Sequence, residues 1–441
     1  MTAPCSDTTT NLDGPTAGVG AGADDTAATR VPIDDIAAGA VGYPYDAILL
    51  AGFGGPEGPD DVLPFLRNVT RGRGVPEDRL TEVARHYQVL GGVSPINEQT
   101  AALRDELQDE LIDRGIRLPV LWGNRNWKPY LADTVAAARD SGRTRLLALT
   151  TSAYSSYSSC RQYREDFAAA LLDSRSLGGI TIDKIRPYFD QPGFIEPFVD
   201  AAVDAVRSAL AARIGIEDVE VVFTTHSIPA AMADSSGSPE LSDSGDGGAY
   251  VAQHLAACRT VMDGVAEQLR DVPGEVRWQL AYQSRSGSPQ TPWLEPDIAE
   301  VLRLAAADGH RAVIVAPIGF VSDHVEVIWD LDTEAAEIAG DLGLGFWRLP
   351  TPGTDPRFVA GLADLIAERL GRGLQHSQIV GLPPRPDFCA AQCCPNLRGP
   401  KPTTAGQDSA ADWSGTGAAV ELLAASGIRG EARSGPRDAT R

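Results

Sequence analysis

The sequence predicts an α/β fold made of two Rossmann-like lobes, each with a four-stranded parallel sheet flanked by helices. Eight short apolar segments rich in β-branched residues recur along the chain. Such near-continuous runs are typical of strands buried on both faces, as in parallel sheets. Helical stretches separate these segments, and this alternation predicts α/β layering. Eight strands divide naturally into two sheets of four.

The elements follow one another in a regular order. The predicted strands are 46–54, 119–124, 145–153, 180–188, 219–227, 278–285, 312–320 and 345–350. Apolar residues at helical spacing, often ending at a glycine, predict helices over 95–115, 130–142, 198–215 and 295–309. The Pro- and Gly-bearing stretch 189–194 is a plausible crossover between the lobes.

These elements predict a division of the chain into two lobes, an extension and two tails. We expect a disordered tail at 1–42, a first lobe at 43–192, a second lobe at 193–345, a C-terminal helix and cysteine-bearing extension at 346–398, and a largely disordered tail at 399–441. The C-terminal helix is expected to return to the first lobe.

The bulk composition excludes some classes of function. The chain has 441 residues, 43% of them hydrophobic, which is enough for two medium domains. Its net charge of -22 argues against a nucleic-acid partner, because phosphate binding needs basic surface. We find no apolar run of membrane-spanning length and no secretory signal pattern at the start, so we expect a cytoplasmic protein without a transmembrane segment.

One histidine and three acids stand where a ligand site is expected. His226 leaves a predicted buried strand, and ligands of open parallel sheets bind beyond the carboxyl ends of strands. Glu326, Asp330 and Glu334 follow the strand at 312–320 at a spacing of four, which puts them on one helical face. The histidine alternatively caps the sheet, and the acids alternatively form a solvated face. Apolar neighbours crowd the same turns, which favours acids that line a cavity.

A neutral imidazole that faces a carboxylate can accept protons and can hold a divalent metal briefly. His226 and Glu326 alone supply too few ligands for a permanent zinc site, which needs three or four. A weak site of this kind suits a metal that must be handed on.

Several motifs resemble those of ferrochelatases. They are "THSIP", "YQSRSG" with "PWLEPD", "VSDHVEVIWDLD", "GGPEGPDDVLPFLRNVTRGR" and "YQVLGGVSPIN", spread over residues 45–370. The resemblance is greatest to the actinobacterial, coproporphyrin-using branch. It implies a chelatase-like fold and the insertion of Fe(II) into coproporphyrin III, with release of two protons, in haem biosynthesis. His226 matches the proton-accepting and iron-binding histidine, Glu326 the facing glutamate, and Asp330 and Glu334 the trailing acids.

The resemblance also implies residues that bind the porphyrin. They are Phe53, Arg71, Arg73, Tyr87, Ser94 and Tyr163. An arginine suits a propionate because its planar fork binds a carboxylate bidentately. The alternative is that Arg71 and Arg73 are ordinary solvated surface residues. Phe53 is a departure, since some coproporphyrin-using members place an iron-ligating tyrosine there and a phenyl ring cannot ligate.

Four cysteines match a 2Fe–2S cluster that several ferrochelatases carry. Such a cluster takes four thiolates, and the resemblance implies Cys160, Cys389, Cys393 and Cys394. The C-x3-C-C spacing of the last three differs from better-known family spacings.

Other functions remain open at this point. The alternatives are a protoporphyrin IX ferrochelatase, a cobalt or nickel chelatase that acts on a related tetrapyrrole, and a two-lobed protein that binds a tetrapyrrole without catalysis. The expected partners are the porphyrin, Fe²⁺ and the next haem-pathway enzyme, to which the product is handed over.

Overall fold

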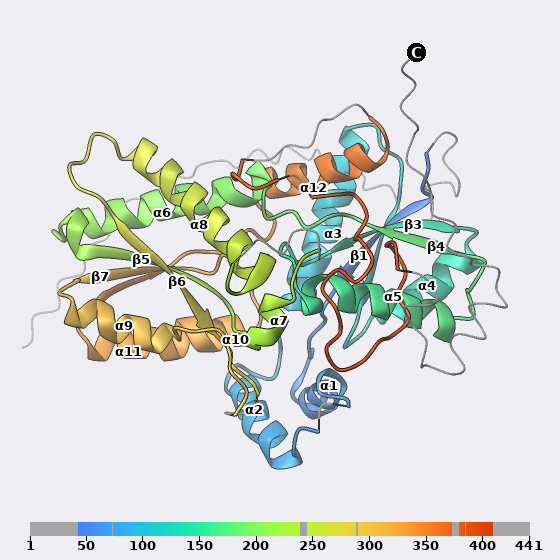
Figure 1. The fold of residues 1–441 in the computed structure, drawn as a ribbon, viewed down its shortest axis with the longest axis horizontal. Coiled ribbons are helices and arrows are strands. Elements are labelled where there is room, and N and C mark those ends of the chain that lie inside the picture. Colours follow the sequence, from blue (N-terminus) through green and yellow to red (C-terminus); the bar gives the residue numbers. More distant parts are fainter. Residues whose placement is uncertain are drawn as a thin grey trace, which may run out of the picture.

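The computed structural model confirms the predicted fold class: two four-stranded parallel sheets with helices on both faces (Figure 1). It describes residues 43–72, 74–238, 245–287, 290–372, 379–383 and 385–408. The predicted N-terminal tail and Arg73 lie outside these ranges, as do residues 409–441.

Both sheets have the same strand order, with the first strand of each lobe in an inner position. In the first lobe the order is β2 (Val120–Asn124), β1 (Ala47–Gly52), β3 (Arg145–Thr150) and β4 (Thr181–Lys184). In the second lobe it is β6 (Arg277–Gln283), β5 (Val219–His226), β7 (Ala312–Ala316) and β8 (Gly345–Arg348). β1 and β7 are buried along their whole length, as their apolar sequences predict.

One continuous core joins the two lobes. The helices that cover the shared face of the sheets are α3 (Ile96–Asp113), α6 (Pro192–Ala211), α8 (Gly248–Gln268) and α12 (Pro356–Arg369). The opposite faces carry α4 (Leu131–Asp140) and α5 (Gln162–Asp173) in the first lobe, and α9 (Ile298–Ala307) and α11 (Ala336–Asp341) in the second. The lobes are therefore packed together through one helical layer.

A helical pair lies apart from these layers, at the bottom of Figure 1 between the lobes. It consists of α1 (Val62–Val69) and α2 (Glu77–Val89). The apolar cluster inside this pair includes Val325 of the second lobe. The pair therefore bridges the two lobes on the side opposite α12.

The C-terminal part of the chain returns to the first lobe. Arg114 of α3 pairs with Asp364 of α12 at 2.5 Å, and Arg369 donates a hydrogen bond to the Tyr45 hydroxyl at 2.7 Å. Residues 385–408 then run along α5. The last ten of them, which the sequence assigns to the tail, belong to this packed segment, because the Asp408 side chain is fully buried against Arg164.

Candidate functional site

His226 and Glu326 face each other between the lobes. The Nε2 atom of His226 lies 3.6 Å from Oε2 of Glu326, and the two side chains are 34% and 41% exposed. His226 ends β5, and Glu326 lies in α10 (Val325–Val327), which follows the neighbouring strand β7. The carboxyl ends of adjacent parallel strands meet at one edge of the sheet, so the topology itself brings the two side chains together.

Gly319 is required for this close approach. A Cβ atom at Gly319 would lie 2.8 Å from the backbone of Thr225, the residue before His226. The chain that leaves β7 therefore passes directly against the strand end that carries the histidine.

The proton-accepting atom of His226 is fixed by its other ring nitrogen. Nδ1 lies 2.6 Å from the carbonyl oxygen of Ser227, and a carbonyl only accepts. Nδ1 must carry the hydrogen, which leaves the lone pair of Nε2 facing Glu326. Burial lowers the pKa of His226, but the negative charge of the nearby Glu326 favours the protonated ring, outweighs burial and raises the pKa above its usual value.

Asp330 is held by the strand next to His226. Its Oδ2 atom accepts hydrogen bonds from the Ser284 hydroxyl and, at 3.2 Å, from Nε2 of Gln283. Burial is the main reason that its pKa rises from 3.8 to about 7, and the charges of Glu326 and Glu334 add to it. Asp330 therefore exchanges a proton near neutral pH.

The segment that carries the trailing acids is a π-helix rather than the expected α-helix. It spans η6 (Ile328–Ala335) between α10 and α11. Single π turns inside helices recur at functional sites. Glu334 is exposed, and its Oε1 accepts a hydrogen bond from Trp329 Nε1 at 2.8 Å, five residues earlier. The acids thus extend from the half-buried Asp330 to the exposed Glu334.

Two predicted porphyrin-binding residues pack on Phe65 of the helical pair α1–α2. Tyr87 is buried in α2 and packs on Phe65, with ring centroids 6.0 Å apart. Burial and the charge of Glu326 raise the pKa of Tyr87 well above its usual value, so the two side chains are neighbours across the lobes. Phe53 packs edge-on against Phe65 at 6.3 Å and is 37% exposed.

The other predicted porphyrin residues are placed differently. Ser94 is buried, and its amide donates to the carbonyl of Pro56. Tyr163 is buried in the first-lobe core with the Arg125 guanidinium 3.7 Å above its ring. Arg71 lines a hollow of about 910 Å³ together with three further cations, Arg125, Arg398 and Lys401. The porphyrin roles of all three residues stay predictions.

The four cysteines of the predicted cluster meet at one place. Cys160 contacts Cys389 and Cys394, and Cys393 contacts the same two. The Sγ atoms of Cys393 and Cys394 are 3.8 Å apart. Hydrogen bonds from Cys160 and Cys393 hold the pKa of Cys389 well below its usual value. No three His, Cys, Asp or Glu side chains within the described ranges are arranged to hold one metal ion, so the cluster stays a prediction.

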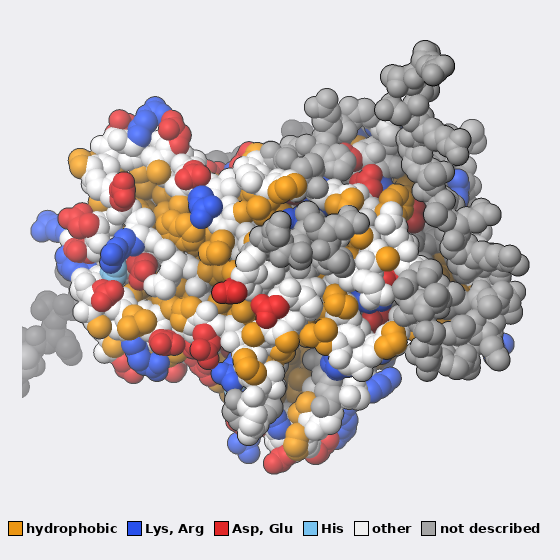
Figure 2. All heavy atoms as spheres, viewed as in Figure 1, with side chains coloured by type: hydrophobic (Ala, Val, Ile, Leu, Met, Phe, Trp, Pro, Cys, Tyr) orange, Lys and Arg blue, Asp and Glu red, His pale blue; other side chains and the backbone are white. Residues whose placement is uncertain are grey.

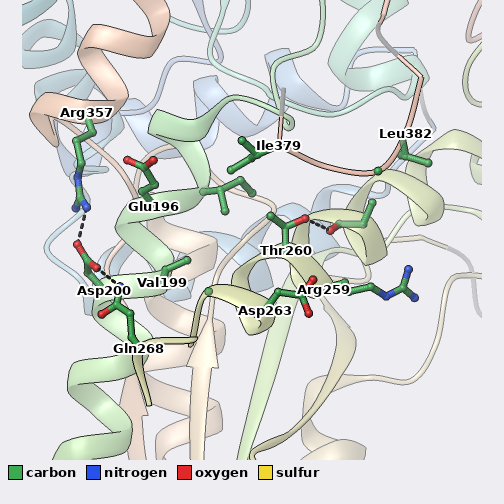
Figure 3. Close-up of a pocket in the computed structure, with 14 residues that line it drawn as sticks. Glu196, Val199, Asp200, Arg259, Thr260, Asp263, Gln268, Arg357, Ile379 and Leu382 are labelled. Atoms are coloured by element: carbon green, nitrogen blue, oxygen red, sulfur yellow. Dashed lines mark hydrogen bonds and ion pairs between the residues drawn. The ribbon is translucent and has the colours of Figure 1, made fainter. Parts of the chain in front are cut away.

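A groove between α6 and α8 contains none of the predicted site residues. Figure 2 shows hydrophobic side chains gathered over these helices, and the groove has a volume of about 840 Å³. Polar side chains at one end are paired with one another: Asp200 accepts from Gln268 at 3.0 Å and pairs with Arg357 at 2.5 Å (Figure 3).

The sequence reading missed three residues that hold the site in place. Gln283 and Ser284 bind Asp330, and Tyr250 donates a hydrogen bond to the carbonyl of His226 at 2.8 Å. Gln283 and Ser284 lie in the motif "YQSRSG", which indicated this segment. No residue pattern indicated which of its side chains bind Asp330. Tyr250 lies in α8 and gave no signal.

Comparison with known proteins identifies the family of the chain. The family model described as Ferrochelatase matches residues 45–370. Proteins named coproporphyrin III ferrochelatase from Leifsonia xyli and Streptomyces coelicolor are each 53% identical over 373 residues, covering 82% and 83% of this chain and 94% and 97% of theirs. A solved structure, SirB from Bacillus subtilis with Fe3+, is similar at 12% identity and a TM-score of 0.40, covering 75% of this chain and 98% of its own.

Among the described helices, none has the length and apolar character needed to cross a membrane.

Proposed function

The chain belongs to the ferrochelatase family, and from that premise we propose that it inserts Fe(II) into coproporphyrin III to give coproheme in haem biosynthesis. The reaction exchanges one Fe²⁺ ion for the two pyrrole N–H protons of the porphyrin. The observation that carries the proposal is the His226–Glu326 pair, 3.6 Å apart between the lobes, with Asp330 behind it.

His226 has the properties of the group that accepts pyrrole protons. Its Nε2 lone pair is free, because Nδ1 donates to Ser227. The adjacent Glu326 carboxylate stabilises the imidazolium that forms when Nε2 takes a proton. Two atoms that each bind one divalent ion at about 2 Å lie up to about 4 Å apart, so the same pair also suits brief contact with the incoming Fe²⁺ substrate.

The trailing acids suit onward transfer of the protons. Asp330 has a pKa of about 7 and is ready both to take and to release a proton at neutral pH. Glu334 is exposed at the other end of the π-helix and reaches solvent. This arrangement favours catalysis over mere tetrapyrrole binding, since a binding protein needs no route for protons.

The choice of porphyrin rests on the relatives. The two relatives described above are named for coproporphyrin III, whereas a protoporphyrin IX enzyme and a cobalt or nickel chelatase are the alternatives. An anaerobic assay with Fe²⁺ and each porphyrin separately, followed by absorbance, distinguishes these functions. Faster insertion of iron into coproporphyrin III supports the proposal, and insertion of Co²⁺ or Ni²⁺ but not Fe²⁺ overturns it. Hand-over of the product to the next pathway enzyme remains part of the proposal.

We further propose that the four cysteines hold a 2Fe–2S cluster. A cluster of this type takes four thiolates, two on each iron, and the four sulfurs lie in pairwise contact. Positive side chains surround them: Lys184 and Arg164 both lower the pKa of Cys389. These cations would balance the negative charge of a thiolate-bound cluster. Bound there, it would tie the C-terminal extension to α5.

A further inference from the structure

Ser284 has an unusual backbone conformation at the edge of the site. It directly follows β6, and its φ of 59° lies in the left-handed region that residues with a side chain rarely adopt. Such conformations persist where the surrounding structure fixes them, often at functional sites. Here the conformation turns the Ser284 hydroxyl onto Oδ2 of Asp330.

The same strand end is tied to the histidine. Gln283 pairs in register with His226 across β6 and β5, and the amide of Ser227 donates to the Gln283 carbonyl at 2.8 Å. The Gln283 side chain donates to the same Asp330 oxygen that Ser284 binds. The position of Asp330 relative to His226 is therefore set by two donors at the end of β6.

The negative charges around Asp330 and the hydrogen bond from Ser284 have opposite effects on its ionisation. Burial and two carboxylates, Glu326 on α10 and Glu334 on η6, raise the pKa of Asp330, whereas His226 on β5 lowers it. The nearby cation Arg285 pairs with Glu295 at 3.7 Å. The Ser284 hydroxyl favours the ionised carboxylate, because its hydrogen bond is strongest to the charged form.

We propose that Ser284 is a positioning residue that holds the Asp330 carboxylate in place and in its ionised form, ready to receive protons from the His226–Glu326 pair. This inference rests on the proposed function and adds to it a residue that acts through Asp330. Its left-handed backbone is the strain that the protein tolerates for this hydrogen bond.

The test uses two replacements that both accept a left-handed backbone. Ser284→Gly removes the hydroxyl and relieves the strain, whereas Ser284→Asn tolerates the conformation and retains a donor. In Ser284→Gly we expect the acid limb of the pH–rate profile of iron insertion to shift to higher pH by about one unit. At pH 6 this shift would lower the insertion rate by about tenfold relative to the wild type. Its thermal stability should equal or exceed that of the wild type. Ser284→Asn should restore most of the wild-type profile.

A second measurement does not depend on activity. The Asp330 carboxyl is titrated by carbon-13 NMR or by infrared difference spectra, with Asp330→Asn used to assign the signal. An upward shift of this titration in Ser284→Gly supports the inference, and an unchanged titration overturns it. If the wild type inserts no iron while the titration still shifts, the proposed function fails and the role of Ser284 in holding Asp330 stands.

Discussion

His86 and Trp329 stack face to face, with ring centroids 4.3 Å apart and planes 9° from parallel. His86 lies in α2 of the first lobe and Trp329 in the π-helix of the second. The same indole donates its Nε1 hydrogen to Glu334. One aromatic contact therefore joins the helical pair α1–α2 to the segment that carries the trailing acids, and it fixes the outermost acid. The stack therefore brings residues of both lobes together next to the trailing acids.

Replacing His226 by alanine should nearly abolish iron insertion while porphyrin still binds. The lost imidazole is the group with a free lone pair facing Glu326, and a general base typically contributes at least about 100-fold. Insertion is measured anaerobically by absorbance, and porphyrin binding by quenching of its fluorescence. His310→Ala is a matched control, because His310 precedes β7 at the end of the strand away from the site. More than about a tenth of the wild-type rate would contradict this role.

Glu326→Gln should lower insertion more than Asp330→Asn or Glu334→Gln. Glu326 is the acid that faces His226, and its amide replacement keeps the shape while removing the charge. Asp330 and Glu334 lie further along the path, where water can reroute a proton. The three variants are compared by kcat at pH 8. Equal and small losses at all three positions would instead favour a solvated acidic face.

Asp330→Asn should stabilise the fold at alkaline pH although it slows the reaction. A carboxyl whose pKa rises from 3.8 to about 7 binds its proton more tightly when folded, so its ionisation above pH 7 costs stability. That cost declines as the pH falls below 7 and is gone only below the unfolded pKa of 3.8. We expect the variant to have a Tm about 2 °C or more above that of the wild type at pH 8, with the difference shrinking by pH 5.

The exposed Glu337→Gln, on α11, serves as the control for this comparison. It removes one charge close to the same helix without touching Asp330. A Tm difference for Asp330→Asn that is the same at pH 5 and pH 8 would mean that Asp330 does not titrate between these values.

Asp408→Ala should release the C-terminal extension. The Asp408 side chain is fully buried with Arg161 at 3.1 Å and with Arg164, and both arginines would be left without this partner. Breaking a buried ion pair on one side typically costs about 3–5 kcal/mol. Hydrogen exchange of residues 385–408 should rise sharply, whereas Gln407→Ala, an exposed neighbour, should leave it unchanged. Protection that survives Asp408→Ala would show that other contacts hold the extension.

The sequence predicted the fold well because the fold depends on local patterns. Buried runs such as that of β5 mark parallel strands, and the order of the strands places His226 and Glu326 at one sheet edge. Features that depend on contacts distant in sequence were not readable. The left-handed Ser284 donates its hydroxyl to Asp330, which lies 46 residues later. The packing of Asp408 needs Arg164, 244 residues earlier, and composition alone suggested a disordered tail.

The helix that carries the acids shows the same limit. Spacing of four residues predicted an α-helical face. Residues 328–335 instead form a π-helix, in which hydrogen bonds join residues five apart rather than four. The pattern of acids is compatible with both geometries, because the choice between them depends on packing against the second-lobe core, where Leu331 and Ala335 are buried.

Replacing any one of Cys160, Cys389, Cys393 or Cys394 by serine should remove the colour of the purified protein. Each of the four thiols contacts two of the others, and each single loss would leave one iron of a 2Fe–2S cluster a thiolate short. Cys258→Ser is the matched control, because Cys258 is a buried thiol of α8 whose neighbours belong to the hydrophobic core. Iron and acid-labile sulfide should amount to about two each per chain in the wild type and in this control.

Cluster loss should also loosen the extension, because three of its four proposed ligands lie in 385–408 and the fourth lies beside α5. Hydrogen exchange of this segment should therefore increase in Cys160→Ser, and the Tm should fall. Iron insertion need not change, since the insertion site uses His226 and Glu326. A colourless, sulfide-free protein prepared without oxygen would contradict the cluster.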